Sequence, residues 1–433
     1  MRLYDDYSVY QGRVQFSINS QFRNWLPFKD QSFYSVGSGI TPNIPECVLN
    51  VPLLGNVAPV VWASGLKVTV PVMDSEFFEA LKSVKKCLQN MYPNLRLEGE
   101  VVPLKLEYPR DKLSKQGRVA LLFSGGLDSV FSLEQNIEAS PDLVVVRGSD
   151  IKLGDDHGWN NVIRGVEDVA IARKVEVELI ESNFYSFLDQ DFLNSISPEY
   201  STWWGGVQHG LGLSALLAPL AYSKGYSKVL ISATHSEGYS APWGSNPRLD
   251  NEIKFFGVKV EHYGYSHSRQ AKLQKIINGK KKAKNVPLRV CYKNVGQAGE
   301  NCCRCEKCLR TILGITVAGG DHSELGFHTS NSAALSGLRM MFANGAIKFD
   351  DNLEFQYKDI QSAIKQRKKT GPTRSDDRQE VDLAWIQGLD IDKIRSQQAD
   401  NSLHTPCHPS NLLGWFRLLY KKSWKYRKFS LQR

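Results

Sequence analysis

The sequence predicts an α/β protein whose central part is a doubly wound parallel sheet. Two observations predict this fold class. Short apolar runs, each the length of one strand, alternate with helix-length segments between residues 119 and 233. A turn with two adjacent glycines follows the first of these runs directly. Strands that alternate with helices pair in parallel, because each helix returns the chain to the same edge of the sheet.

The apolar runs place four strands in the central region. The predicted strands are Val119–Phe123, Leu143–Arg147, Val175–Ile180 and Val229–Ala233. Ligands of parallel sheets bind beyond the carboxyl ends of the strands. Three loops are therefore candidates for a binding site: residues 124–129, 148–150 and 234–237.

The loop after the first strand has the composition of an anion-binding turn. Two glycines let a backbone turn sharply and approach an anion, while N–H groups of the turn and of the following helix point at it. The serine hydroxyls add donors, and Asp128 is predicted to position Mg²⁺ or the reacting phosphate. The alternative is a Gly-Gly turn capped by a polar side chain. The stretch reads Ser124-Gly125-Gly126-Leu127-Asp128-Ser129.

A cluster of cysteines indicates a metal site. Five of the eight cysteines fall within residues 291–308, which is a poor layout for disulfides in a large domain. A closed site of four thiolates supports the fold and leaves no position open for substrate. The alternatives are an iron–sulfur cluster and a set of reduced cysteines in a core. The expected zinc ligands are Cys291, Cys302, Cys305 and Cys308, and Cys303 is not expected to bind the metal.

The Ser-Gly-Gly-Leu-Asp-Ser motif resembles the pyrophosphate loop of the PP-loop ATP pyrophosphatases. It differs from the Walker loop, because no Gly-Lys-Ser/Thr follows the glycines. Together with the cysteine cluster it resembles the 7-cyano-7-deazaguanine synthase family, over residues 116–320. The resemblance implies a Rossmann-like domain that splits ATP into AMP and pyrophosphate. It also implies adenylation of a carboxylate or amide oxygen, followed by attack of ammonia or another amine.

The resemblance assigns roles to individual residues. Ser124, Gly125, Gly126, Asp128 and Ser129 match the nucleotide loop of the family, and the four cysteines match its zinc ligands. The implied cofactors are ATP, Mg²⁺ and Zn²⁺. Near the substrate the family carries a Gly-Tyr-Pro-Asp-Cys-Arg type of segment. This chain departs from it with residues 237–243, Glu-Gly-Tyr-Ser-Ala-Pro-Trp, so the acceptor substrate stays open: a small molecule, a nucleobase or a macromolecule.

Further candidates lie at the other strand ends. Asp150 is predicted to contact the base or ribose of the nucleotide, or alternatively to cap a turn or helix. His235 and Glu237 are candidate proton-transfer groups, with a solvated loop pair as the alternative. Trp203 and Trp204, just before an apolar helix predicted for residues 211–222, either line a planar pocket or belong to the core.

The sequence contains fewer structural signals in the regions that flank the central domain. Residues 1–115 contain alternating segments and are expected to form a β-rich α+β module of their own, followed by the catalytic domain at 116–325. Residues 326–433 are expected to be a mainly helical extension, with a helix at 333–344 and a linker at 365–377.

Charge and hydropathy restrict the partners. The formal net charge is +9, and basic residues concentrate in segments 280–284 and 421–428. The second of these is either a contact for nucleic acid or an acidic protein surface, or a frayed terminus. No apolar stretch approaches the ~20 residues that cross a bilayer, so we expect a cytoplasmic protein that does not bind membranes and that could form oligomers.

The sequence is compatible with three functions: an adenylating enzyme, an RNA-thiolating relative, and a non-catalytic nucleotide-binding component of a multi-protein system such as a bacterial anti-phage system. The second requires a reactive cysteine, for which only Cys303 stands free. Asparagine synthetase carries the same loop motif, but its glutaminase half requires a cysteine where this chain has Arg2.

Overall fold

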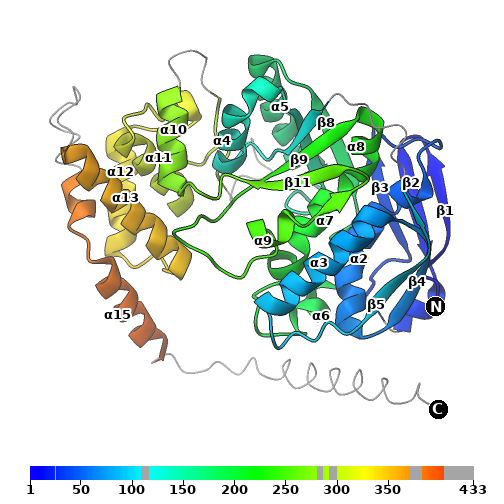
Figure 1. Ribbon diagram of the computed structural model, residues 1–433. Helices are drawn as coiled ribbons and strands as arrows, with labels where there is room; N and C mark the ends of the chain where they lie inside the picture. Colours follow the sequence, from blue (N-terminus) through cyan, green and yellow to red (C-terminus); the bar gives the residue numbers. More distant parts are fainter. Residues whose placement is uncertain (25, 109–116, 280–285, 292–299, 370–382, 404–433) are drawn as a thin grey trace.

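A computed structural model describes residues 1–24, 26–108, 117–279, 286–291, 300–369 and 383–403 (Figure 1). Its main feature is a nine-stranded sheet in the order β1-β2-β3-β8-β7-β6-β9-β11-β10. The five strands from β8 to β11 in this order are parallel to one another. The protein is therefore a mixed α/β fold with a parallel centre, as predicted.

The four predicted central strands are confirmed within two or three residues at each end. They are β6 (Arg118–Leu122), β7 (Asp142–Arg147), β8 (Val177–Ser182) and β9 (Tyr226–Ser232). A fifth, β11 (Val258–Tyr263), was not predicted, although its alternation of apolar and polar residues indicates a strand. The short β10 (Lys254–Phe255) pairs antiparallel with it at the edge.

The sheet buries both of its faces at β6, β7 and β9, which explains why these strands are rich in apolar residues. In β7, Val144 belongs to one hydrophobic core and its neighbours Leu143 and Val145 belong to the other. The first core is closed by α1 (Glu46–Leu49), α2 (Val51–Ser64), α3 (Ser75–Met91), α7 (His209–Leu216) and α8 (Ala218–Lys224). The second is closed by α4 (Leu127–Gln135), α5 (Asp156–Arg173), α10 (Arg269–Gly279) and α11 (Glu306–Val317).

The amino-terminal strands extend the same sheet. The antiparallel strands β1 (Tyr4–Tyr10), β2 (Arg13–Ile18) and β3 (Ser32–Gly37) join it through the pairing of β3 with β8. A second sheet consists of the parallel pair β4 (Lys67–Asp74) and β5 (Glu100–Glu107). The described residues before 109 thus share a core with β6, β7 and β9, while the boundary at residue 115 stays a prediction.

The carboxyl-terminal part is helical where it is described. It contains α12 (Asn331–Ala343), which confirms the predicted helix, α13 (Asp351–Lys369) and α15 (Ile391–Leu403). The predicted linker is wrong for residues 365–369, which continue α13 because Tyr357, Ile360 and Ile364 bury one face of that helix. The rest of the linker and both basic segments lie outside the described residues.

The helix predicted for residues 211–222 is in fact two helices. It breaks at Leu217, because Pro219 has no N–H to continue the helix and favours the first turn of α8. Two shorter helices, α6 (Gln190–Asn194) and α9 (Pro247–Asp250), lie on either side of this pair in the sequence. Within the described ranges, no helix is both long and apolar enough to span a membrane.

Candidate functional site

The strand order places two of the candidate loops at one point of the sheet. Moving from β6, the chain goes to β7 and β8 on one side and to β9 and β11 on the other. The carboxyl ends of β6 and β9 therefore flank the position at which the strand order reverses, where parallel sheets bind ligands. The loop 124–129 follows β6 and the loop 234–237 follows β9.

The glycine loop, residues 124–129, turns directly into α4. Gly125 has φ +72°, a left-handed conformation that favours glycine, and Gly126 is the extended residue before the helix. Ser129 donates to the Gly126 carbonyl at 3.0 Å, and the Ser124 hydroxyl lies 3.3 Å from both the Ser129 hydroxyl and the Gly126 N–H. The serines shape the loop from within, and the first turn of α4, which carries Leu127, points its free N–H groups toward the loop.

Asp128 is held by two cations from α10. Its Oδ1 accepts from the Lys272 ammonium at 2.7 Å, and its Oδ2 lies 3.4 Å from the Arg269 guanidinium. Burial raises the pKa of Asp128, but these positive charges outweigh it, so the net pKa is lowered and the carboxylate is ionised. Lys272 also donates to the Ala233 carbonyl at the end of β9, which ties the two loops together.

Four basic side chains lie around the glycine loop. Besides Arg269 and Lys272, Arg289 donates through Nε and Nη2 to the Ser124 carbonyl at 3.2 and 2.8 Å. Lys307, in the first turn of α11, interacts electrostatically with Asp128 and Arg269, but burial lowers its pKa to about 7, so it is only partly charged at neutral pH. Such a concentration of positive charge at a helix amino terminus suits a polyphosphate.

In the sequence, Arg248 and Arg269 are candidate contacts for phosphate or a carboxylate, with a solvated side chain as the alternative. The other three basic residues were not predicted. Arg269 and Lys272 are three residues apart and therefore share one face of α10, a spacing that could have signalled the pair. Arg248 is exposed on α9, which packs on α3.

The candidate residues at the other strand ends lie near this loop to different degrees. His235 is partly buried, and the Asp128 charge acts on its pKa. Asp150, after β7, is exposed; burial lowers the pKa of both Arg289 and His209, and the Asp150 charge partly offsets this in each case. Glu237 is exposed, and its backbone N–H donates to Tyr265.

The two tryptophans of the predicted pocket have different positions. Trp203 is fully buried and belongs to the core, so the core interpretation holds for this residue. Trp204 is partly exposed, and its ring centroid lies 4.9 Å from that of His209. It begins a π-helix, Trp204–Gln208, an uncommon conformation that is frequent at functional sites.

A continuous row of rings leads from Trp204 to the carboxyl-terminal helices. Successive centroids, from His209 through Trp243, His235 and Tyr239 to Phe355 of α13, are 5.9, 5.8, 5.4 and 5.8 Å apart. Within the described part of the chain, the buried nitrogens His209 Nδ1 and Trp243 Nε1 have no hydrogen-bond partner. Buried polar groups of this kind normally have partners, so this row is suited to a planar ligand with its own polar groups.

Glycines allow the Trp243 segment to lie against the π-helix. The Gly244 N–H donates to Gly205 at 2.7 Å, and the Gly210 N–H donates to Gly244 at 2.9 Å. A Cβ on Gly205 would lie 2.6 Å from the Trp243 ring, and one on Gly210 would lie 2.7 Å from the Gly244 carbonyl. The residues around Trp243 are thus held against the π-helix by backbone contacts.

The buried histidines predict an acid-sensitive fold. Burial is the main cause that lowers the pKa of both His209 and His235 below the ordinary value of about 6.5. Because the unfolded chain takes up these protons first as the pH falls, stability is present above about pH 6.5 and declines below it. We expect urea denaturation to give an unfolding free energy at least ~1 kcal/mol lower at about pH 5.5 than at about pH 7.5. Replacing both histidines with asparagine should reduce this difference, and an unchanged difference would assign it to other groups.

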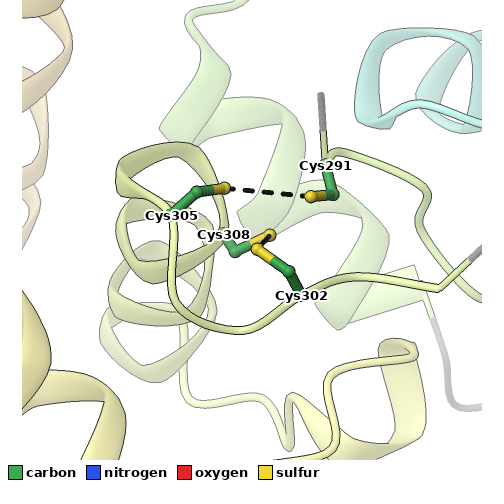
Figure 2. Close-up of side chains that lie close together, drawn as sticks. All are labelled: Cys291, Cys302, Cys305 and Cys308. Atoms are coloured by element: carbon green, nitrogen blue, oxygen red, sulfur yellow. Dashed lines mark hydrogen bonds between the residues drawn. The ribbon is translucent and has the colours of Figure 1, made fainter. Parts of the chain in front are cut away.

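The four predicted cysteine ligands come together (Figure 2). Cys305 is the residue before α11, Cys308 lies in its first turn, Cys302 lies on the preceding turn, and Cys291 comes from a separate segment. The Sγ atoms of Cys291 and Cys305 are 3.9 Å apart, as are those of Cys302 and Cys308, and all four lie within 4.8 Å of one another. Hydrogen bonds from Cys308 are the main cause that lowers the pKa of Cys305 to about 5, so this sulfur is a thiolate, the form that binds metal.

The sulfur positions favour a single ion. A tetrahedral zinc site with Zn–S bonds of about 2.3 Å has sulfurs about 3.8 Å apart, close to the observed separations. An iron–sulfur cluster occupies more room and requires more widely spaced sulfurs. The cluster can therefore hold a metal such as zinc. Cys303 is not part of it, and its thiol is directed to the Asn301 carbonyl at 3.4 Å.

Comparisons of this chain with protein-family models, with curated proteins and with solved structures found no match.

Proposed function

We propose that this protein is an adenylating enzyme of the 7-cyano-7-deazaguanine synthase type, which splits ATP into AMP and pyrophosphate. One observation carries the proposal: the Ser-Gly-Gly-Leu-Asp-Ser loop lies where the strand order reverses, and three cationic side chains, Lys272, Arg269 and Arg289, contact it. A backbone cradle with converging cations is suited to the pyrophosphate part of ATP. The four-cysteine metal site beside it agrees with the same family.

In the proposed reaction, an oxygen of the acceptor carboxylate or amide forms a bond to the α-phosphorus of ATP. The bond from that phosphorus to the bridging oxygen breaks, and pyrophosphate leaves with the electron pair. Lys272, Arg269, Arg289 and Lys307 stabilise the charge that develops on it. Ammonia or another amine then attacks the activated carbon and AMP leaves. Mg²⁺ bound with ATP would supply further charge neutralisation.

The row of rings from Trp204 to Phe355 is the proposed site of the acceptor. It passes near the glycine loop at His235, whose pKa is affected by the Asp128 charge. The pKa of His235 is lowered chiefly by burial, so its imidazole is neutral at neutral pH and can accept a proton from the attacking amine. A planar acceptor would stack on a ring of this row, and an oxygen or nitrogen at its edge would accept a hydrogen bond from the buried Nε1 of Trp243.

The proton-transfer role of His235 predicts a large kinetic effect. We expect His235→Asn to lower turnover by about a hundredfold, as for the loss of a positioned general base. Glu237→Gln is the control variant, because Glu237 is exposed on the same loop and its substitution should change turnover much less. Steady-state AMP release at several pH values gives the measurement. Equal losses in the two variants would contradict the assignment to His235.

The products of ATP cleavage test the function directly. The protein would be incubated with ATP, Mg²⁺, ammonium and a panel of deazapurine acids, nucleic acids and peptides, and the nucleotides would be separated. The expected products are AMP and pyrophosphate in equal amounts, dependent on one member of the panel. ADP and phosphate as the products would refute the proposal. Tight ATP binding without turnover would instead favour a nucleotide-binding component of a larger system.

The RNA-thiolating alternative gains no support. It requires a reactive thiolate, whereas burial raises the pKa of Cys303 and disfavours its thiolate form.

A further inference from the structure

The cysteine site and the glycine loop are joined by one short segment, Leu288–Cys291, here called the bridging segment. Its four consecutive backbone N–H groups all donate to other parts of the protein. Leu288 donates to Leu325 at 3.0 Å, and Arg289 donates to Gly125 of the glycine loop at 2.8 Å. Val290 and Cys291 both donate to the side chain of Asn301. The segment is therefore fixed between the loop and the turn that carries the other cysteines.

Asn301 holds the bridging segment on its metal side. This residue is 8% exposed and directly precedes the ligand Cys302. Its Oδ1 accepts from Val290 at 3.0 Å and from Cys291 at 3.2 Å. Its Nδ2 donates to the Leu288 carbonyl at 2.6 Å and to the Gly326 carbonyl at 3.0 Å. One buried amide thus makes four hydrogen bonds, three of them to the bridging segment.

The other side of the bridging segment meets the glycine loop. The Arg289 guanidinium donates twice to the Ser124 carbonyl, and a Cβ on Gly125 would lie 3.6 Å from the Arg289 Cβ. Arg289 is two residues from the ligand Cys291. The position of this cation at the loop therefore depends on the segment that carries Cys291.

We propose that a metal ion bound by the four cysteines sets the affinity of the glycine loop for polyphosphate, and that Asn301 is the positioning residue that transmits this effect through the bridging segment. Cys291 and the other three ligands lie on separate parts of the chain, which a shared ion draws together. With the ion present, Arg289 is held at the loop in advance, so nucleotide binding costs less free energy for ordering this side chain. The proposal rests on the proposed nucleotide function of the loop.

Thermodynamic linkage makes the proposal measurable from both sites. If the metal raises the affinity for a nucleotide by some factor, the nucleotide raises the affinity for the metal by the same factor. We expect this factor to be on the order of tenfold. A metal that only stabilises the fold would lower the denaturation temperature when removed, and would not produce this reciprocal effect in folded protein.

The test uses Zn²⁺ as the metal and the α,β-methylene analogue of ATP as the nucleotide. Calorimetry would measure binding of the analogue to zinc-loaded protein and to protein stripped with a chelator under reducing conditions, with circular dichroism to verify folding. The reciprocal measurement follows transfer of zinc to a chromogenic chelator with and without the analogue. We expect affinity for the analogue to fall about tenfold without zinc, and the analogue to slow zinc transfer.

Asn301→Ala separates positioning from folding, because it retains all four thiolates. This variant should still bind one zinc ion, bind the analogue about tenfold more weakly, and lose the effect of the analogue on zinc transfer. The matched control is Asn50→Ala, since Asn50 is also a buried amide with side-chain hydrogen bonds and lies remote from the loop, near Tyr4 and Val72. It should lower stability and leave both binding measurements unchanged.

The outcomes are distinguishable. Unchanged zinc transfer in the presence of bound analogue, or a normal response in Asn301→Ala, would overturn the coupling and leave the nucleotide function standing. If zinc-loaded protein binds no analogue at all, the proposed function fails and the coupling fails with it.

Discussion

Asp128→Asn is expected to lower AMP release by at least about a hundredfold, the largest kinetic effect of any single substitution in the glycine loop. Asp128 is ionised and holds Lys272 and Arg269 at the loop. The asparagine has the same shape but removes the charge that fixes these cations. Initial rates of AMP release at saturating ATP, with the acceptor found by the product screen, give the measurement.

Asparagine is preferable to alanine at this position because Asp128 also has a structural role. The Lys272 side chain is 2% exposed, so Asp128→Ala would leave a buried ammonium with neither a counter-charge nor an acceptor, at a cost of about 3 to 5 kcal/mol, whereas asparagine keeps an acceptor oxygen for it. The control is Asp142→Asn, the same chemical change in a carboxylate that pairs with Arg118 at the opposite ends of β6 and β7. An equal fall in turnover in the control would indicate a folding defect. Normal turnover in Asp128→Asn would show that Asp128 has no role in the reaction.

Cys305→Ser should cause the largest loss of stability. Cys305 is the cysteine whose pKa is lowered to about 5, and with Cys308 it attaches α11 to the metal site. Structural zinc sites contribute roughly 10 kcal/mol or more of binding free energy in small domains, so loss of the ion should lower the unfolding free energy by several kcal/mol. Metal analysis of the purified variant measures the loss of the ion, and urea denaturation measures the loss of stability.

Cys303→Ser is the matched control for this substitution. Cys303 lies in the same turn, but its sulfur is not among the four clustered sulfurs. The metal content of the Cys303→Ser protein should therefore match that of the unmodified protein. A Cys305→Ser protein that folds normally but is inactive would show that the structural role assigned to the metal is wrong.

The sequence predicted those parts of the protein that depend on neighbouring residues. The central strands are nearly continuous apolar runs, because both faces of β6, β7 and β9 are buried. The glycine loop and the cysteine ligands are short motifs whose geometry is largely local, apart from Cys291. Its position among the ligands came from the family resemblance and the cysteine count.

The sequence did not predict features that arise when distant segments meet. Lys272 reaches Asp128 across 144 positions, and Arg289 reaches Ser124 across 165. A lone lysine or arginine in a helix or loop has the same sequence appearance whether it is solvated or buried. The two adjacent tryptophans were equally ambiguous, since a π-helix, which turns Trp203 into the core and leaves Trp204 at the site, has no clear sequence signal.

The contact between Tyr239 and Phe355 has a consequence for the smallest active form of the protein. These rings lie 5.8 Å apart, and a Cβ on Gly238 would lie 2.9 Å from the Phe355 ring, so α13 covers one end of the row of rings. A chain cut at residue 325 would retain every sequence motif and lose this cover. Expression of the motif-bearing region alone would therefore be an unsuitable test of the proposed activity, because the proposed acceptor site is completed from outside that region.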